Sequence, residues 1–155
     1  MTETTLTDVS LDSNDPLLVE VADDSTTATA RLKRLDSAGL KAELANYQGT
    51  EQWYQHSLVW QLLYTDGVLC FAENGGAQGA YWFIDFVATD VWPLLKQQPF
   101  MVIVLSVSDQ ASAVITIDDG NNHVLKTWHI HYTDLQPGIW RFFITDNVLL
   151  LPSEY

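Results

Sequence analysis

The spacing of apolar residues changes abruptly near residue 100, and this change constrains the fold more than any other feature of the sequence. Between Ala80 and Gln97 the apolar residues recur every three or four positions, which is the period of an amphipathic helix. From Phe100 onward they alternate with polar residues, as in half-buried strands. A helix followed by consecutive strands predicts an α+β domain rather than alternating βαβ units.

Four segments in the second half of the chain have this alternation. They are the ranges 100–108, 113–118, 123–132 and 139–145. The linkers 118–122 and 136–138 hold the Asp, Asn, Pro and Gly residues that turns require. We therefore expect an α+β fold in which an antiparallel sheet of about four strands is covered by two or three helices from the N-terminal half.

Helices are predicted over residues 37–47 and 80–97. Asp36 or Ser37 can cap the first helix, because short polar side chains accept hydrogen bonds from the first free amides. The second helix carries Pro93 near its end, and the missing amide of proline predicts a kink or a stop there.

Three segments between these helices are less regular. Residues 50–56 are expected to form a short helical turn, and the apolar run 58–64 fits a strand or a helix equally well. Residues 66–74 begin with Asp-Gly, which suits either a two-residue hairpin turn or the start of a helix. We favour the helix, because the apolar residues of this segment make a helical stripe.

Residues 1–34 predict an acidic, mostly disordered arm ahead of a single domain over residues 35–155. The first 30 residues hold seven acids and no base, together with a run rich in Thr and Ser. The β-branched segment 17–21 interrupts this composition, and the sequence leaves open whether it docks on the domain. The domain is acidic as well, since residues 35–155 hold 13 acids and four bases.

The formal net charge of −13 comes from 20 acidic and seven basic residues. A surface that follows a nucleic-acid backbone needs clustered Lys and Arg, and an anionic membrane attracts the same residues. We therefore expect neither nucleic acid nor a membrane as a partner.

Three absences in the sequence bear on the cellular compartment. The single cysteine, Cys70, precludes an internal disulfide. No run approaches the roughly 18 consecutive apolar residues of a membrane-spanning helix. The N-terminus lacks the basic and apolar stretches of a secretory signal. A cytoplasmic location is therefore expected.

Four segments are distinctive enough to compare with known families: GTEQWY at 49–54, YTDGV at 64–68, GAYWFID at 79–85 and TDNVLLLPSEY at 145–155. Over residues 40–155 the chain resembles a family of small bacterial proteins that carries a domain of unknown function and often occurs on plasmids and other mobile elements. The chain differs from the family pattern in its acidic arm and in a longer link at 75–78. The resemblance implies no chemistry, cofactor or site residue.

Polar and aromatic side chains within or next to these segments are candidates for a pocket or an interface. Imidazole and carboxylate groups suit general acid–base catalysis where a pocket shifts their pKa values, and Trp and Tyr are favoured anchors at protein interfaces. Helix caps, turns and polar helix faces are the alternative roles of the acids, so no residue is assigned as catalytic. The candidates are Trp53, Tyr54, His56, Tyr64, Asp66, Tyr81, Trp82 and Asp85.

A metal site has weak support. His129 and His131 lie two positions apart on a predicted strand, so their side chains point to the same side of the sheet. A zinc site needs a third ligand from elsewhere, and no Cys pair or His-Glu-x-x-His motif supplies one. Exposed sheet histidines are the preferred interpretation, and no cofactor is expected.

Three functions remain. The leading hypothesis is a non-enzymatic protein-interaction module that binds a protein partner or a second copy of itself, because catalytic signatures are missing and aromatic residues are abundant. The alternative is a small-molecule-binding protein or enzyme with a pocket between the helix 80–97 and the sheet. The third is an acidic mimic of nucleic acid from a mobile element.

Overall fold

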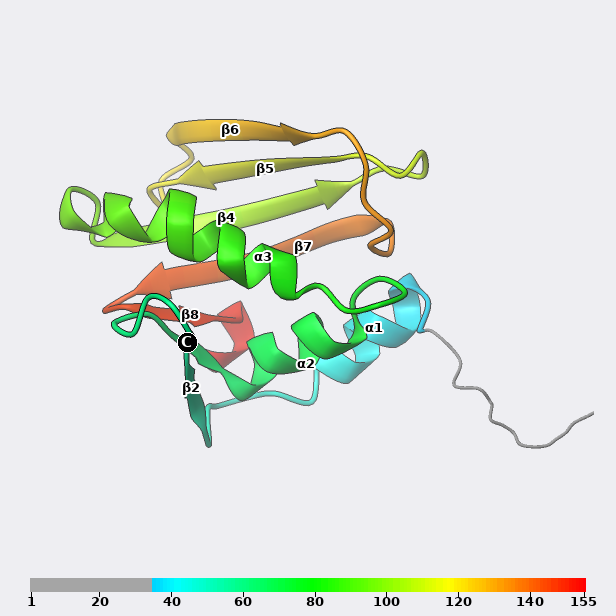
Figure 1. Ribbon diagram of the computed structural model, residues 1–155, viewed down its shortest axis with the longest axis horizontal. Helices are drawn as coiled ribbons and strands as arrows, with labels where there is room; N and C mark the ends of the chain where they lie inside the picture. The colour runs from blue at the N-terminus through cyan, green and yellow to red at the C-terminus, as the bar shows by residue number, and fades with distance from the viewer. Residues whose placement is uncertain (1–34) are drawn as a thin grey trace, which may run out of the picture. The chain divides into compact units, whose positions relative to one another are not determined.

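The computed structural model describes residues 35–155, in which helices pack on a seven-stranded sheet (Figure 1). The predicted arm, with its segment 17–21, lies outside the described residues. The main elements in chain order are α1 (Ser37–Leu44), β2 (Trp53–Gln55), β3 (Leu63–Thr65), α2 (Asp66–Asn74), α3 (Tyr81–Phe86), β4 (Phe100–Val107), β5 (Ala113–Asp118), β6 (Val124–Ile130), β7 (Gly138–Thr145) and β8 (Val148–Leu150).

The sheet has the strand order β2-β3-β8-β7-β4-β5-β6. Every pair is antiparallel except β3 and β8, which run parallel. The α+β class and the four strands expected in the second half are therefore confirmed as β4 to β7. The expectation of about four strands in all is wrong, because β2, β3 and β8 extend the sheet on one side.

One face of the sheet carries the core. Burial along β4 and β5 alternates with every residue, as the two-residue period requires. The rings of Phe71 on α2, Phe83 on α3 and Phe142 on β7 are fully buried, and their centroids lie 4.6 to 5.8 Å apart. In Figure 1, α3 and its continuation cross in front of β4 and β7. This packing joins the N-terminal and C-terminal halves in one core.

The predicted helix 80–97 is divided into three parts. After α3 the backbone widens into a π-helical turn, η2 (Val87–Val91), and then tightens into a 3₁₀ helix, η3 (Trp92–Lys96). Pro93 lies at the start of η3, where a missing amide is tolerated. The sequence predicts a kink or a stop near Pro93, and the structure shows a change from π to 3₁₀ helix there. The helix α1 is also shorter than the predicted 37–47.

The irregular segments resolve as one helix and two short strands. Residues 66–74 form α2, as favoured, and the Thr65 hydroxyl accepts a hydrogen bond from the Val68 amide as the N-cap. The helical turn expected over 50–56 is wrong, since β2 lies there and pairs with β3. A further short 3₁₀ helix, η4 (Pro152–Glu154), follows β8. No helix within residues 35–155 is both long and apolar enough to cross a membrane.

Candidate functional site

His56 and Asp85, two of the predicted site residues, are in direct contact. The His56 ring is buried, and its Nε2 lies 2.8 Å from Asp85 Oδ1. Its Nδ1 accepts hydrogen bonds from the amides of Leu58 and Val59 at 3.1 and 3.0 Å. Because both amides donate to Nδ1, the ring proton sits on Nε2 and is donated to Asp85. Neither nitrogen is left for a substrate, so this pair holds backbone in place.

The backbone held by His56 is the link between β2 and β3, residues 56–62, which we call the anchor loop. Leu58 and Trp60 on this loop are 84% and 69% exposed. Single exposed apolar residues are common, but two large ones two positions apart on one short loop form a candidate contact surface. Neither residue is among the candidates from the sequence, although both belong to the apolar run 58–64.

The anchor loop is fixed from both ends. The amide of His56 donates to the carbonyl of Leu62 at 3.0 Å, and the amide of Leu62 donates to the carbonyl of Val59 at 3.0 Å. The Gln55 side chain donates to the carbonyl of Trp60 at 3.2 Å. Leu62 is fully buried and Val59 packs against the core. The exposed Leu58 and Trp60 therefore project from a backbone with a defined conformation.

Three predicted residues, Tyr54, Tyr64 and Tyr81, form what we call the tyrosine cluster. The rings of Tyr54 and Tyr64 stack with centroids 5.7 Å apart. The pKa of the Tyr64 hydroxyl is raised mainly by burial and then by its neighbours Tyr54, Asp85 and Glu73. The pKa of Tyr81 is raised mainly by burial and then by Glu73 and Tyr64. The charged groups that act on these rings are thus both acids, and one of them, Asp85, binds the anchor loop.

The remaining predicted residues lie elsewhere. Trp82 is half-buried and packs edge-on against Phe83, so it belongs to the core. Trp53 lines a hollow of about 320 Å³ with Thr145, Val148 and neighbouring residues. Asp66 lines a separate hollow. The eight candidates therefore do not converge on one pocket.

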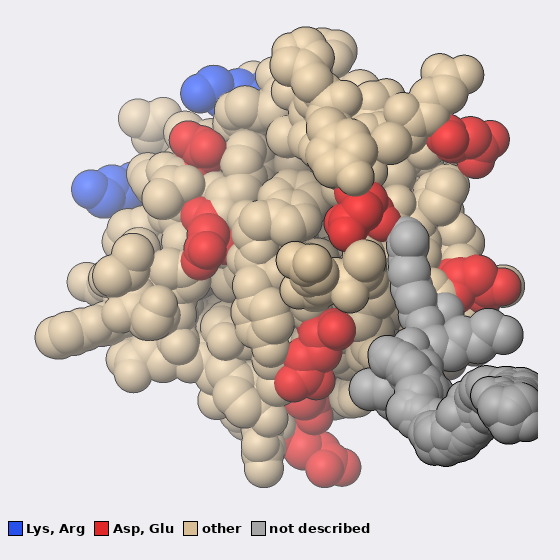
Figure 2. Space-filling model, turned by 45° about the vertical axis from the view of Figure 1, so that its right-hand side comes forward, with Lys and Arg blue, Asp and Glu red and all other residues tan. Residues whose placement is uncertain are grey.

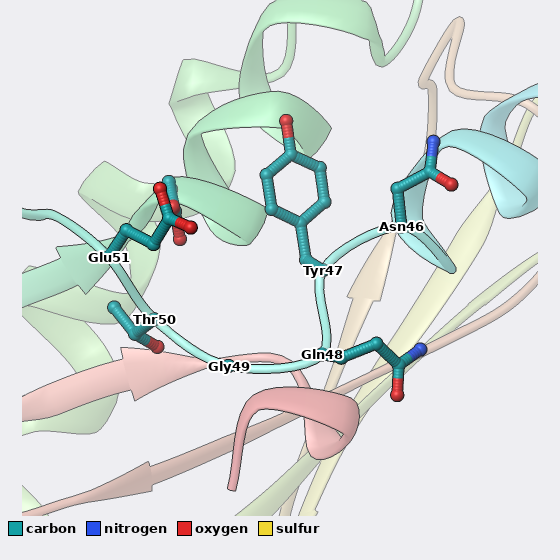
Figure 3. A pocket seen from close by; sticks show the side chains of 7 residues that line it. Asn46, Tyr47, Gln48, Gly49, Thr50 and Glu51 are labelled. Carbon is teal, nitrogen blue, oxygen red and sulfur yellow. The ribbon is translucent and has the colours of Figure 1, made fainter.

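The hollow beside Asp66 has a volume of about 420 Å³ and is formed mainly by loop 46–51 (Figure 3). The Tyr47 ring stands between loop and helices, and the Glu51 carboxyl points to the same side. Burial, followed by the neighbouring Cys70, raises the pKa of Tyr47 to about 12. Burial also raises the pKa of Cys70, so the thiol stays protonated near neutral pH and is a poor nucleophile.

A buried carboxyl, Glu154, joins two of the segments singled out in the sequence, 64–68 and 145–155. It accepts hydrogen bonds from the Thr65 hydroxyl at 2.6 Å, the Gly67 amide at 3.1 Å and the Leu151 amide at 3.0 Å. Burial raises its pKa most, and a hydrogen bond with Asp66 raises it further. Glu154 thus ties the last residues of the chain to the first turn of α2.

The weak metal candidates are not joined by a further ligand. His129 lies on the edge strand β6 opposite Val114, and both His129 and His131 are exposed. Within the described part of the chain, no three His, Cys, Asp or Glu side chains are grouped closely enough to hold a metal ion.

The fold and its sites together define an α+β protein in which helices pack on a mostly antiparallel sheet and a hydrogen-bonded loop exposes two large apolar side chains. The model of a family of unknown function, DUF6876, matches residues 38–155, and the chain belongs to this family. The resemblance to a family of unknown function is confirmed, whereas its bacterial source and mobile elements stay predictions. Neither the curated proteins nor the solved structures compared with the chain gave a match.

Proposed function

We propose that this protein is a non-enzymatic interaction module that binds a partner protein through the anchor loop. The observation that carries the proposal is the 84% and 69% exposure of Leu58 and Trp60 on a loop whose backbone is held by His56. Trp is among the residues most enriched at binding hot spots, and a hot spot needs surrounding contacts that exclude water. The half-buried Tyr54 and Tyr64 lie on β2 and β3, the two strands that the anchor loop connects, and the exposed Tyr81 lies one turn before Asp85, which binds His56.

The energetics favour binding at this loop. Burying a large apolar side chain contributes about 1.5–3 kcal/mol, so Leu58 and Trp60 together supply a substantial part of a micromolar affinity. A flexible loop loses part of this gain when it becomes ordered on binding. Because hydrogen bonds within residues 56–62 already order this loop in the folded domain, binding a partner does not carry that entropy cost again.

The enzymatic alternative has less support. A general base needs a free nitrogen or oxygen near a substrate, and both nitrogens of His56 already have partners. The pocket expected between the helix 80–97 and the sheet would lie where Phe83, Val87 and Val91 are fully buried. These side chains fill the space as core.

The test compares protein capture by three versions of the full chain. The double variant Leu58→Ser/Trp60→Ser removes the apolar contacts of the anchor loop. The control, Val124→Ser/Tyr132→Ser, changes two side chains that are 62% and 73% exposed on and next to β6. Immobilised proteins are incubated with lysate of the source organism, and bound proteins are quantified by mass spectrometry.

We expect a protein that the wild type and the control retain and the loop variant loses. Sedimentation of the three purified proteins shows whether that partner is a second copy, since self-association would then also fail in the loop variant alone. Equal retention by all three proteins, or no specific retention by the wild type, contradicts the proposal.

A further inference from the structure

Beside the anchor loop, the tyrosine cluster combines aromatic rings with carboxylates. Asp85 is bound to His56 through one oxygen, yet its side chain remains 70% exposed. Tyr81 lies one helical turn before Asp85 on α3, so the two side chains share a face, and the rings of Tyr54 and Tyr64 stack at 5.7 Å. Glu73 on α2 is exposed, and its charge raises the pKa of Tyr64 and of Tyr81. Within residues 35–155, neither acid is in an ion pair with Lys or Arg.

We infer that the tyrosine cluster with Glu73 and Asp85 receives a Lys or Arg side chain of the partner, so that the anchor loop binds a basic protein surface. This inference rests on the proposed function and names its partner class. The face of an aromatic ring attracts a cation, and the attraction strengthens as water is excluded. A neighbouring carboxylate adds a charge-assisted hydrogen bond.

The charge of the domain points to the same partner. Residues 35–155 hold 13 acids and four bases, and on the face shown in Figure 2 acidic side chains are scattered widely while basic ones lie at one margin. Two of the four bases, Lys41 and Lys126, lie over the rings of Trp140 and Trp128. Such a field accelerates the approach of a basic protein.

The same charges argue against a second copy of this chain at the anchor loop. Two copies meeting through this surface would bring Glu73 and Asp85 of each near the acids of the other. Like charges placed together across an interface cost several kcal/mol. A basic partner turns both acids into favourable contacts, so the surface fits a different, cationic protein.

The first experiment measures binding of fluorescein-labelled nona-arginine by anisotropy, with nona-glutamate as the negative probe. The test variant, Glu73→Gln/Tyr81→Leu, removes one acid and one exposed tyrosine from the cluster. The control, Asp109→Asn/Tyr132→Leu, removes one exposed acid and one exposed tyrosine next to the β4–β5 turn. Both variants change the net charge equally, so general attraction to an acidic chain cancels.

We expect the test variant to bind nona-arginine about fivefold more weakly than the wild type or worse, as loss of a partly desolvated cation site implies, and the control to stay within about twofold. Raising the salt concentration should reduce the difference in nona-arginine affinity between the test variant and the wild type. Equal affinity of the two variants, or no binding of nona-arginine by the wild type, overturns the inference.

The Leu58→Ser/Trp60→Ser variant separates this inference from the proposed function. It should lose the captured partner but bind nona-arginine within about twofold of the wild type, because the cluster is intact. If Glu73→Gln/Tyr81→Leu retains both partner and peptide, the interaction module stands and the cation site is wrong. If Glu73→Gln/Tyr81→Leu weakens nona-arginine binding while the wild type captures no partner, the cation site is supported and partner binding through the anchor loop is refuted.

Discussion

Replacing Glu154 with Ala should destabilise the domain strongly. The side chain is 9% exposed, and its loss leaves the Leu151 amide and the Thr65 hydroxyl without their acceptor, while the Gly67 amide keeps Asp66 Oδ1 at 3.1 Å. Each buried donor without a partner costs about 1–3 kcal/mol. Part of this loss is offset, because the variant no longer buries a carboxyl group and water can enter the space that the side chain leaves. We therefore expect a decrease of about 3 kcal/mol in the free energy of unfolding.

Urea denaturation followed by circular dichroism measures this change. For a domain of this size, about 3 kcal/mol corresponds to a decrease in Tm of roughly 10 °C. Glu154→Gln keeps one acceptor oxygen and should lose about 1–2 kcal/mol. The matched control is Ser153→Ala, which removes one exposed hydrogen bond to the Tyr47 carbonyl. A loss below about 1 kcal/mol for Glu154→Ala would refute the assignment of Glu154 as a structural tie.

The pH dependence of the same variants tests the raised pKa of Glu154. Between the ordinary pKa of 4.5 and the raised folded value, the native state keeps a proton that the unfolded state has released. Stability then falls as pH rises through this window, and the full contribution is present below it. The stability of the wild type relative to Glu154→Gln should therefore decrease from acidic to neutral pH. A constant or rising difference would contradict the raised pKa.

Three further outcomes are expected. Gly67→Ala should lose about 1–2 kcal/mol by urea denaturation, because the new Cβ would lie 2.7 Å from the buried Glu154 Oε1. His56→Ala should speed amide exchange, measured by NMR, at the two anchor-loop amides that its ring accepts from, while the core amides of β4 stay protected. Trp60→Ser should change the free energy of unfolding by less than about 0.5 kcal/mol, since an exposed side chain has little to lose on folding.

The strands from residue 100 onward could be predicted because their signal is local. Each residue of β4, β5 and β7 alternates between a buried face and a more open one, so the period of two is written directly into the sequence. The turn at Asp146-Asn147 is local in the same sense, since both residues adopt positive φ, which Asn and Asp tolerate better than most.

The strands β2, β3 and β8 could not be predicted in the same way. Each has three residues, which is too short to show a period. Their order depends on contacts far along the chain, such as the parallel pairing of β3 with β8. The Glu154 tie has the same origin, because a carboxyl near the chain end meets an amide 87 positions earlier. No local sequence pattern predicts a contact between residues so far apart in the chain.

Composition misleads most at the anchor loop. Leu58, Trp60 and Leu62 belong to one apolar run, yet Leu62 is fully buried while the other two are 84% and 69% exposed. The difference arises because His56 accepts two backbone hydrogen bonds and turns the chain. A hydrophobic residue in sequence therefore predicts burial only where the backbone continues as a regular element.

The pairing of His56 with Asp85 shows how a correct grouping of residues can carry a different chemistry. The sequence placed both among the candidates for a pocket or interface, and the structure joins them at 2.8 Å. In an acid–base pair the second imidazole nitrogen faces a substrate. In this protein the second nitrogen of His56 accepts hydrogen bonds from two backbone amides, so the pair stabilises the conformation of the anchor loop. In that conformation Leu58 and Trp60 are exposed and accessible to a partner.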